Sequence, residues 1–304
     1  MRYSVVVPAF NEQEVLPLTY PRLKSVMELL GDYEIIFVND GSRDATLSIL
    51  KDIAAKDKTV KVISFSRNFG HQEAVSAGMR ESGGDAVIII DCDLQDPPEV
   101  IPEMAEKWKA GADIVYGQRI KRKGESAFKK LTAHLYYKTL HLLGGQFIPR
   151  DTGDFRLIDR KVCDVLNSMP ERNRFLRGMA AWAGFKAVPQ EFVREERAAG
   201  KTRYSLRKML KLAGDGITSF SNRPLKLPLV SGAALALLSA AYLAASIVLV
   251  CLDVWDYIHI LFALAFLLIA ALFVCLGIFG LYLGRIYDEA KARPIYIIEE
   301  KINF

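Results

Sequence analysis

The sequence has few cysteines and few histidines. It contains four of each among 304 residues, and they do not stand at the spacings that paired metal ligands use. Cys251 and Cys275 lie in very apolar stretches, where a thiol behaves as a small hydrophobic side chain. We therefore expect no disulfide framework, and we interpret His71 and His134 as structural or hydrogen-bonding residues, not as metal ligands.

The chain also lacks a large excess of charge and a secretory signal. Its formal net charge of +5 does not by itself indicate a nucleic-acid partner, and we expect none. The opening MRYSVVVPAF reaches a polar turn after a few apolar residues, too soon for the core of a signal peptide. Hydrophobic residues make up 51% of the sequence, which excludes disorder and allows a sizeable core. We expect the N-terminal domain to stay in the cytoplasm.

Two long stretches near the C-terminus contain no charged side chain. Residues 227–252 and 260–284 are each long enough, as helices, to cross about 30 Å of hydrocarbon. A buried helical hairpin is the alternative, but uncharged runs of this length are rare outside membranes. The loop DVWDYIH between them has no Lys or Arg, whereas basic residues flank the pair. The positive-inside rule then predicts a multi-pass protein of the inner membrane with both chain ends in the cytoplasm.

The segment before the first apolar stretch has a different pattern. Apolar residues recur there at helical spacing with Arg207, Lys208 and Lys211 between them, which predicts an amphipathic helix near anionic lipid head groups. A solvated helix that covers the soluble domain is the alternative. The sequence thus divides into a cytoplasmic domain, an amphipathic segment, a two-helix membrane domain and a cytoplasmic tail: 1–200, 201–224, 225–286 and 287–304.

Apolar segments of strand length alternate with longer helical patterns over the first 120 residues. Predicted strands cover residues 3–8, 34–39, 60–65, 86–91 and 113–117. This rhythm is typical of an α/β sheet with mostly parallel strands. Polar clusters follow the first four strands, namely PAFNE, NDGSRD, SRNFGHQ and DCDLQD. Because ligands bind at the carboxyl ends of such strands, we expect one crevice to collect these clusters.

Three aspartates follow the fourth predicted strand, in the stretch IIIDCDLQDPPE. If the chain stays extended there, Asp91 and Asp93 point to the same side, and their carboxylates can converge on one cation or ligand. Carboxylate oxygens suit Mg²⁺ or Mn²⁺, which fill their remaining positions with phosphate oxygens and water. Taken alone, an Asp-x-Asp pair is more often a turn or capping feature, so the metal hypothesis depends on context.

That context is a set of five motifs in order: VVVPAFNE, VNDGSRD, SRNFGHQEAVSAG, DCDLQDPPE and DTGDFRLIDR. With the two apolar stretches after them, they resemble the inverting family-two glycosyltransferases that load a sugar from a nucleotide donor onto a polyprenyl phosphate. The subgroup comprises enzymes similar to dolichyl-phosphate mannose synthase and to the GtrB-type undecaprenyl-phosphate glucosyltransferases. The resemblance implies a GT-A fold, a Mg²⁺ or Mn²⁺ cofactor, a UDP-glucose donor and a tetramer built through membrane-proximal contacts.

The resemblance also implies roles for residues on the donor side. Asp91 and Asp93 match the metal and nucleotide motif, with Asp93 counted among the catalytic residues, and Asp40 is expected to accept a hydrogen bond from the base. The residues expected to contact the nucleotide sugar are Pro8, Asn11, Glu12, Asp40 and Asp91.

In DTGDFRLIDR the resemblance implies a catalytic aspartate, which we assign to Asp154, with Asp151 as the second candidate. Without the resemblance, both would be interpreted as loop or capping residues. Gln95 is expected beside the sugar and the acceptor, and Arg156 at the Asp154 loop or the diphosphate. The acceptor is a phosphomonoester whose second pKa is about 6, so it hardly needs a general base. We therefore expect Asp154 mainly to orient the sugar or to stabilise its positive character.

Basic residues after the fifth predicted strand are candidates for binding the acceptor phosphate. Arg119 is the first of them, because a guanidinium suits phosphate geometry. Lys129 and Lys130 follow on an amphipathic segment, for which a solvated basic face is the alternative. The loop REERAAGKTRYS brings Lys201 and Arg203 towards the membrane interface, where they are expected to close over the diphosphate.

Two other functions share parts of this pattern. A processive polysaccharide synthase has the same fold and donor chemistry, but it carries a Gln-x-x-Arg-Trp motif in which Trp108, Trp182 and Trp255 do not stand. A non-catalytic membrane-anchored binding protein would be expected to lose the acidic motifs, which are all present. We therefore predict an enzyme that transfers a sugar to a polyprenyl phosphate on the cytoplasmic leaflet. Glucose is the first choice of sugar, and galactose, N-acetylglucosamine and aminoarabinose are the alternatives.

Overall fold

The computed structural model describes residues 1–120, 152–195, 234 and 258–304. These residues belong to two compact units. The first unit includes residues 1–120 and 152–195 and then 294–304, whereas residues 258–293 belong to the second. The chain therefore leaves the first unit and returns to it at Pro294.

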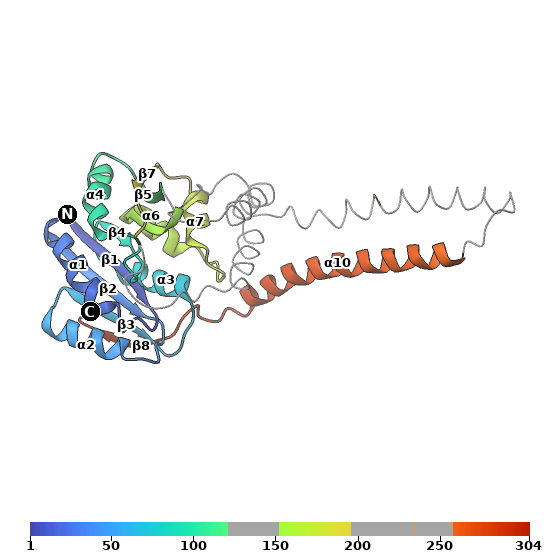
Figure 1. Ribbon diagram of the computed structural model, residues 1–304, viewed down its shortest axis with the longest axis horizontal. Helices are drawn as coiled ribbons and strands as arrows, with labels where there is room; N and C mark the ends of the chain where they lie inside the picture. The colour runs from blue at the N-terminus through green and yellow to red at the C-terminus, as the bar shows by residue number, and fades with distance from the viewer. Residues whose placement is uncertain (121–151, 196–233, 235–257) are drawn as a thin grey trace. The chain divides into compact units, whose positions relative to one another are not determined.

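The first unit is built on one eight-stranded sheet with the order β7-β5-β6-β4-β1-β2-β3-β8 (Figure 1). Four of its neighbouring pairs are parallel, while β6 and β8 run antiparallel to their neighbours. All five strands predicted from the sequence are present. The strands are β1 (Arg2–Ala9), β2 (Asp32–Asn39), β3 (Val60–Phe65), β4 (Ala86–Ile89), β5 (Ile114–Arg119), β6 (Thr152–Asp159), β7 (Ala187–Phe192) and β8 (Ile298–Ile302).

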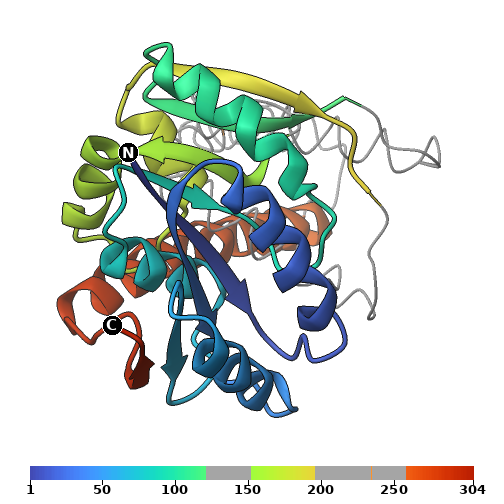
Figure 2. The same cartoon turned by 90° about the vertical axis from the view of Figure 1, so that its left-hand side faces the viewer.

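Helices cover both faces of this sheet, which is why its central strands read as continuous apolar runs. One face packs against α1 (Leu16–Glu28), α2 (Thr46–Lys56) and α4 (Ile101–Lys109), and Figure 2 shows α1 in blue and α4 in green across that face. The opposite face carries α3 (His71–Glu81), α6 (Arg160–Ser168) and α7 (Leu176–Trp182). A short 3₁₀ helix, η1 (Pro98–Val100), precedes α4.

The helix α3 lies unusually close to the sheet. A Cβ atom at Gly78 would stand 2.3 Å from Cγ1 of Val6, so only glycine permits this approach. The two residues belong to α3 and β1, and their contact fixes the first residue of α3, His71, near the carboxyl ends of the strands. We expected polar residues at these strand ends, and the sheet places them there.

The motif DTGDFRLIDR was treated as a loop in the sequence, and this interpretation was wrong. Its residues Thr152–Asp159 form β6, which lies between β4 and β5 and runs antiparallel to both. Arg156 is opposite Ile89 in this antiparallel register. Continuing the register by two residues places Asp154 opposite Asp91, which follows β4. An antiparallel insertion in a mostly parallel sheet thus joins two acidic motifs that are 63 positions apart (154 − 91).

The sequence predicts a separate tail at residues 287–304, but part of this segment belongs to the sheet of the first unit. Ile298–Ile302 form β8, which pairs with β3 and brings Ile302 opposite Val62. The ring of Tyr296 stacks on Phe65 with centroids 5.1 Å apart and planes 8° from parallel. The C-terminus is therefore an edge of the first unit, next to β3 (Figure 1).

The described part of the second unit consists mainly of α10 (Ile258–Ala290), which has 33 residues. Its stretch Ala271–Ala290 is the one helix among the described residues that is long and apolar enough to cross a membrane. Phe273 is 68% exposed and Leu283 is 66% exposed. The apolar stretch 227–252, except residue 234, and the amphipathic segment 201–224 lie outside the described residues.

Candidate active site

Hydrogen bonds join the loops after β1 and β2. Asn11 donates its backbone N–H to Oγ of Ser42 over 2.9 Å, and its side-chain oxygen accepts from the backbone N–H of Arg43 over 2.7 Å. Asn11 takes a left-handed backbone conformation, with φ of 54°, which is uncommon for a residue other than glycine. The backbone N–H of Glu12 donates to Oγ1 of Thr46 over 2.8 Å. These contacts fix one wall of a cavity.

The cavity has a volume of about 570 Å³ and lies beyond the carboxyl ends of β1, β2 and β3. This volume is within the usual range for small-molecule sites. Gly41 permits its shape, because a Cβ atom there would stand 2.3 Å from the carbonyl carbon of Arg67. Its lining includes Phe10, Asn11, Ser42, Arg67 and Glu299.

Asp40 and Pro8, both expected at the nucleotide, do not line this cavity. Pro8 is buried within β1, opposite Val38 of β2. Asp40 is 3% exposed, and its carboxylate accepts from Nδ2 of Asn68 and from two backbone N–H groups, those of Phe69 at 2.7 Å and Gly70 at 3.0 Å. Burial raises the pKa of Asp40 despite these amides. Asp40 thus holds the β3–α3 loop, and its contact with the base stays a prediction.

The acidic loop after β4 turns sharply at Leu94, which also has a left-handed conformation, with φ of 59°. Oδ1 of Asp93 accepts from the backbone N–H of Gln95 over 3.1 Å. Oδ1 of Asp91 is buried without a hydrogen-bond partner, although Nε2 of His71 lies 3.7 Å away. Burial raises the pKa of Asp91, and the neighbouring charges of Asp154 and Asp93 add to the rise, while His71 opposes it.

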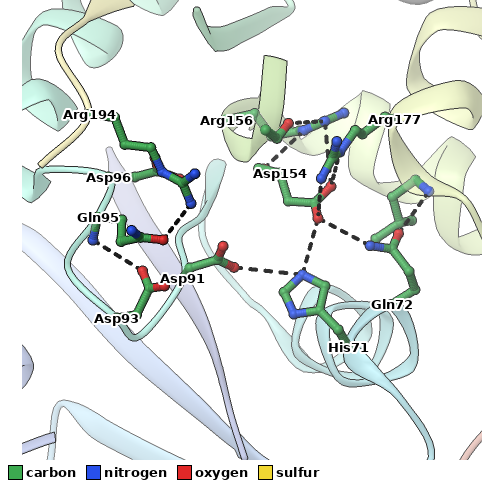
Figure 3. Close-up of polar contacts among 12 residues, drawn as sticks. His71, Gln72, Asp91, Asp93, Gln95, Asp96, Asp154, Arg156, Arg177 and Arg194 are labelled. Carbon is green, nitrogen blue, oxygen red and sulfur yellow. Dashed lines mark hydrogen bonds and ion pairs between the residues drawn. The ribbon is translucent and has the colours of Figure 1, made fainter. Parts of the chain in front are cut away.

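Asp154 is the most heavily contacted carboxylate of the site (Figure 3). Nε of Arg177 donates to Oδ1 over 2.7 Å, and Nη2 donates to Oδ2 over 3.1 Å. Nε2 of His71 and Nε2 of Gln72 each lie 3.2 Å from Oδ2. The partners belong to α7 and to the start of α3, so two helices hold the carboxylate that β6 carries.

The charges of this cluster follow from the same contacts. Burial alone would raise the pKa of Asp154, but the charge of Arg177 and the hydrogen bond with His71 hold it well below its usual value. Burial alone would lower the pKa of His71, but the bond to Asp154 and the charge of Asp91 raise it to about 9. At neutral pH Asp154 is therefore an anion and His71 a cation, and the carboxylate is a weak base.

Arg156 lies behind Asp154 and does not face the open site. Its Nε donates to the backbone carbonyl of Asp154 over 3.2 Å, and its Nη2 donates to that of Gly153 over 3.1 Å. Burial lowers its pKa to about 10. Of the two roles expected for this residue, the contacts favour holding the backbone around Asp154.

Two arginines approach Asp96, one from the last residue of β5 and one from the segment after β7. Nη2 of Arg119 lies 3.3 Å from Oδ1 of Asp96, and Nε of Arg194 lies 4.0 Å from the same oxygen. Arg194 also donates to the side-chain oxygen of Gln95 over 2.6 Å. Gly153 leaves room for Arg119, because a Cβ atom there would stand 2.7 Å from Nη2. Asp96 is 1% exposed, and burial raises its pKa to about 6 against the charge of Arg119.

Several polar atoms of Arg119, Asp96 and Arg194 have no hydrogen-bond partner among the described residues. In the described part of the chain, Nε of Arg119, Nε of Arg194 and Oδ2 of Asp96 are buried without hydrogen-bond partners. Two guanidinium groups share a single carboxylate, which suits a group that receives a further anion. The remaining candidates for the acceptor phosphate, and the second candidate for catalysis, lie outside the described residues: Lys129, Lys130, Lys201, Arg203 and Asp151.

The sequence does not reveal Arg177 and Arg194 as members of the site. Arg177 lies in RFLRG, where no motif or spacing connects it to Asp154. Arg194 is the first residue of the basic loop REERAAGKTRYS, but the sequence does not show that its side chain points to Asp96. His71 belongs to the cluster SRNFGHQ expected at the strand ends, and it forms a hydrogen-bonding contact there, as predicted, with Asp154.

A divalent cation fits this site only with help from its substrate. Among the described residues, no group of three or more histidine, cysteine, aspartate or glutamate side chains has the geometry of a metal site. Asp91 and Asp93 do supply carboxylates, and the orphaned Oδ1 of Asp91 lacks a donor. Mg²⁺ is commonly held by one or two carboxylates together with substrate phosphates. The donor set therefore fits such an ion once phosphate oxygens are added.

Comparison with known proteins identifies the family. Residues 4–166, more than half of the chain, match the family model described as Glycosyl transferase family 2. The chain belongs to this family. It is a glycosyltransferase, as the sequence motifs predicted.

Relatives extend this similarity to the whole chain. The chain is 50% identical to an uncharacterized glycosyltransferase, YkcC, of Bacillus subtilis (strain 168), over 99% of this chain and 94% of the relative. It is 42% identical to a prophage bactoprenol glucosyl transferase homolog of Escherichia coli (strain K12), over 98% and 99%. It is 41% identical to the bactoprenol glucosyl transferase of Shigella phage SfV, over 99% of each chain.

A solved structure shows the same fold. The glucosyl-3-phosphoglycerate synthase of Mycobacterium tuberculosis, crystallised with Mn²⁺, UDP and phosphoglyceric acid, superposes with a TM-score of 0.54 at 21% identity. The match covers 71% of this chain and 76% of that one. The GT-A type of α/β fold with a mostly parallel sheet is therefore confirmed.

The ion pair between Arg177 and Asp154 leads to a first prediction. Arg177→Ala leaves the Asp154 carboxylate without its closest cation, so we expect the free energy of unfolding to fall by about 2 kcal/mol. The loss should be much smaller in an Asp154→Asn background, and a double-mutant cycle on the purified protein measures the difference. Lys161→Ala, which breaks an exposed pair with Asp113, serves as the control, and its expected loss is much smaller because water screens an exposed pair. Equal losses in both backgrounds would contradict the coupling.

Proposed function

We propose that this glycosyltransferase transfers glucose from UDP-glucose to a polyprenyl phosphate at the cytoplasmic face of a membrane, with inversion at the sugar. The observation that carries the proposal is the position of Asp154, an anion that shares His71 with Asp91 of the acidic loop after β4, the loop in which two arginines share Asp96. Relatives named bactoprenol glucosyl transferase, similar over nearly their whole length, support the choice of sugar and of acceptor class.

The donor side consists of the cavity beyond β1–β3 and the acidic loop after β4. A nucleoside in the cavity would extend its diphosphate towards Asp91 and Asp93, since β1 lies between β2 and β4 in the sheet. These two carboxylates would hold Mg²⁺ or Mn²⁺ together with the diphosphate. The ion, when bound, neutralises charge that develops on the departing diphosphate.

The acceptor phosphate is best placed at Arg119 and Arg194. Both guanidinium groups have a buried N–H without a partner, and bidentate contact with phosphate is the geometry that arginine favours. Their present partner, Asp96, has a pKa raised to about 6 by burial, and the lipid phosphate would compete with this carboxylate for the two guanidinium groups. Gln95, bonded to Arg194, would link the arginine to the acidic loop.

The reaction then needs one displacement. An oxygen of the acceptor phosphate attacks the anomeric carbon while the bond from that carbon to the diphosphate oxygen breaks, and UDP leaves. A dianionic phosphate carries no proton to remove, because its second pKa is about 6. Asp154, which Arg177 and His71 keep ionised, stabilises positive charge on the sugar and does not act as a base. A single in-line displacement inverts the anomeric centre.

Transfer to lipid is the direct test. Purified enzyme with UDP-[¹⁴C]glucose, undecaprenyl phosphate and Mg²⁺ should form a chloroform-soluble glucosyl lipid, and EDTA should abolish the product. Asp93→Asn should lower turnover at least 100-fold, because it removes a carboxylate from the metal and diphosphate site. Parallel reactions with UDP-galactose and UDP-N-acetylglucosamine control for the donor. A polymer would point to a processive synthase, and no product with any donor would favour a non-catalytic binding protein.

The rate should depend on pH through the acceptor. The pKa of Asp154 is depressed, so this group stays ionised from pH 5 to 8 and adds no step to the profile. We expect kcat to rise with pH through about 6, as the lipid phosphate becomes dianionic, and then to level off. Asp154→Asn should lower kcat at least tenfold and keep the same profile. A profile that loses its rise in Asp154→Asn would assign the base role to Asp154 instead.

The second unit supports a multi-pass membrane protein. Side chains along α10 such as Phe273 and Leu283 are apolar and about two-thirds exposed, a surface that suits lipid and not water. The chain leaves the first unit and returns to it at Pro294. If α10 crosses the membrane once, a second crossing must precede it, because both ends of the insertion lie on one side. Both termini are then cytoplasmic, and the tetramer stays a prediction from resemblance.

This topology can be measured by labelling. In a cysteine-free variant, a single cysteine in the DVWDYIH loop should react with an impermeant maleimide added to intact cells, because that loop faces outwards. A single cysteine at Arg293 should react only after the cells are permeabilised. Labelling of Arg293→Cys in intact cells would contradict the proposal that the chain crosses the membrane twice.

A further inference from the structure

The C-terminal strand β8 follows the membrane helix in sequence but borders the cavity of the first unit. It pairs with β3, and the backbone N–H of Ser66 donates to the carbonyl of Ile297 over 3.1 Å. The stacked rings of Phe65 and Tyr296 add a second attachment at the same end of β3. The loop that lines the cavity after β3 is thus fixed on its outer side by a segment from the end of the chain.

Glu299 is the residue of β8 that lines the cavity. Its neighbours are already engaged, because Glu300 pairs with Lys51 over 2.6 Å and Lys301 pairs with Glu81 over 2.7 Å. Among the hydrogen bonds and ion pairs of the described residues, none involves the carboxylate of Glu299. Successive side chains of a strand point to opposite faces. The carboxylate of Glu299, which takes part in none of these contacts, therefore points towards the cavity, and that of Glu300 points away from it, towards α2.

Two other side-chain acceptors of the cavity lining are occupied. The side-chain oxygen of Asn11 accepts from the backbone of Arg43, and that of Asn39 accepts from the backbone of Ser42. Among the described residues that line the cavity, Glu299 is the one that carries a carboxylate. A ligand that brings N–H or O–H donors into this cavity thus meets Glu299 as a charged acceptor that is still available.

We infer that Glu299 accepts a hydrogen bond from the nucleoside of the donor and helps to select it, an inference that rests on the proposed function. The diphosphate is directed to Asp91 and Asp93 after β4, so the nucleoside lies towards the other end of the strand order, over β1, β2 and β3. Glu299 borders that end. The donor groups of a uridine are the two ribose hydroxyls and the imide N–H of the base, and each suits a carboxylate acceptor.

Binding of UDP to the full-length enzyme with Mg²⁺, followed by calorimetry, tests this role. Glu299→Ala should weaken UDP binding about tenfold, since hydrogen bonds to charged groups are among the stronger ones. Glu300→Ala, one position along the same edge strand, should change it less than twofold and controls for damage to β8. Binding of pyrophosphate should be the same in both variants. In transfer assays Glu299→Ala should raise KM for UDP-glucose and leave kcat unchanged.

Two modified nucleotides identify the contact. If a ribose hydroxyl donates the hydrogen bond to Glu299, Glu299→Ala should have no effect on the binding of UDP that lacks this hydroxyl, either 2′-deoxy-UDP or 3′-deoxy-UDP. If the imide N–H of the base donates it, Glu299→Ala should have no effect on the binding of N3-methyl-UDP. Equal UDP affinities of Glu299→Ala and Glu300→Ala, with transfer activity intact, would overturn the role of Glu299 and leave the proposed function standing. A wild-type enzyme that binds no UDP and transfers no glucose would contradict the proposed function instead.

Discussion

The antiparallel pairing of β6 with β4 is the constraint on which the site depends. A parallel sheet alone would align the ends of β1 to β4 and collect the acidic loop, but it would leave Asp154 elsewhere. With Arg156 opposite Ile89, the register carries Asp154 to the level of Asp91. A slip of one residue would turn Asp154 to the other face of the sheet, away from Arg177 and His71. The chemistry is therefore set by backbone hydrogen bonds well inside the sheet.

The site balances several like charges at close range. Asp91, Asp93, Asp96 and Asp154 would repel one another if all were ionised without partners. Arg177 and His71 compensate Asp154, whereas Asp91 and Asp96 keep raised pKa values because burial outweighs their partners. Such a site is incomplete without a cation on one side and a phosphate on the other. Substrate and metal together supply the charges that the protein alone leaves unmatched.

The sequence predicts the first five strands well and does not predict the last three. Strands β1 to β5 show continuous apolar runs with polar ends, so local pattern is enough to find them. β6 contains Asp154 and Arg156 within a short apolar frame, and β8 reads IEEKI, which resembles a solvated tail. Both become strands only because a sheet edge or gap is available to pair with them. Such a long-range partner leaves no local signal.

The same limit applies to the site residues. Asp91, Asp93 and Asp154 stand in motifs and were found, whereas Arg177 has no neighbour in sequence that reveals its partner. Asp40 illustrates a different limit, and its expected contact with the base stays a prediction. A motif gives the position of a residue but not its hydrogen bonds, and here loop amides already occupy the carboxylate. The local backbone geometry decides which acceptors remain available to a ligand.

The late position of β8 in the chain also has a consequence for biosynthesis. Residues of β7 end at Phe192, and the strand that completes the sheet begins only at Ile298, after α10. A ribosome therefore finishes the apolar helix before it makes the strand that covers β3. Until then β3 is an open edge, which in other proteins invites pairing with foreign strands. Closure of that edge is thus tied to the order of synthesis, and a chain interrupted within α10 would keep its sheet one strand short.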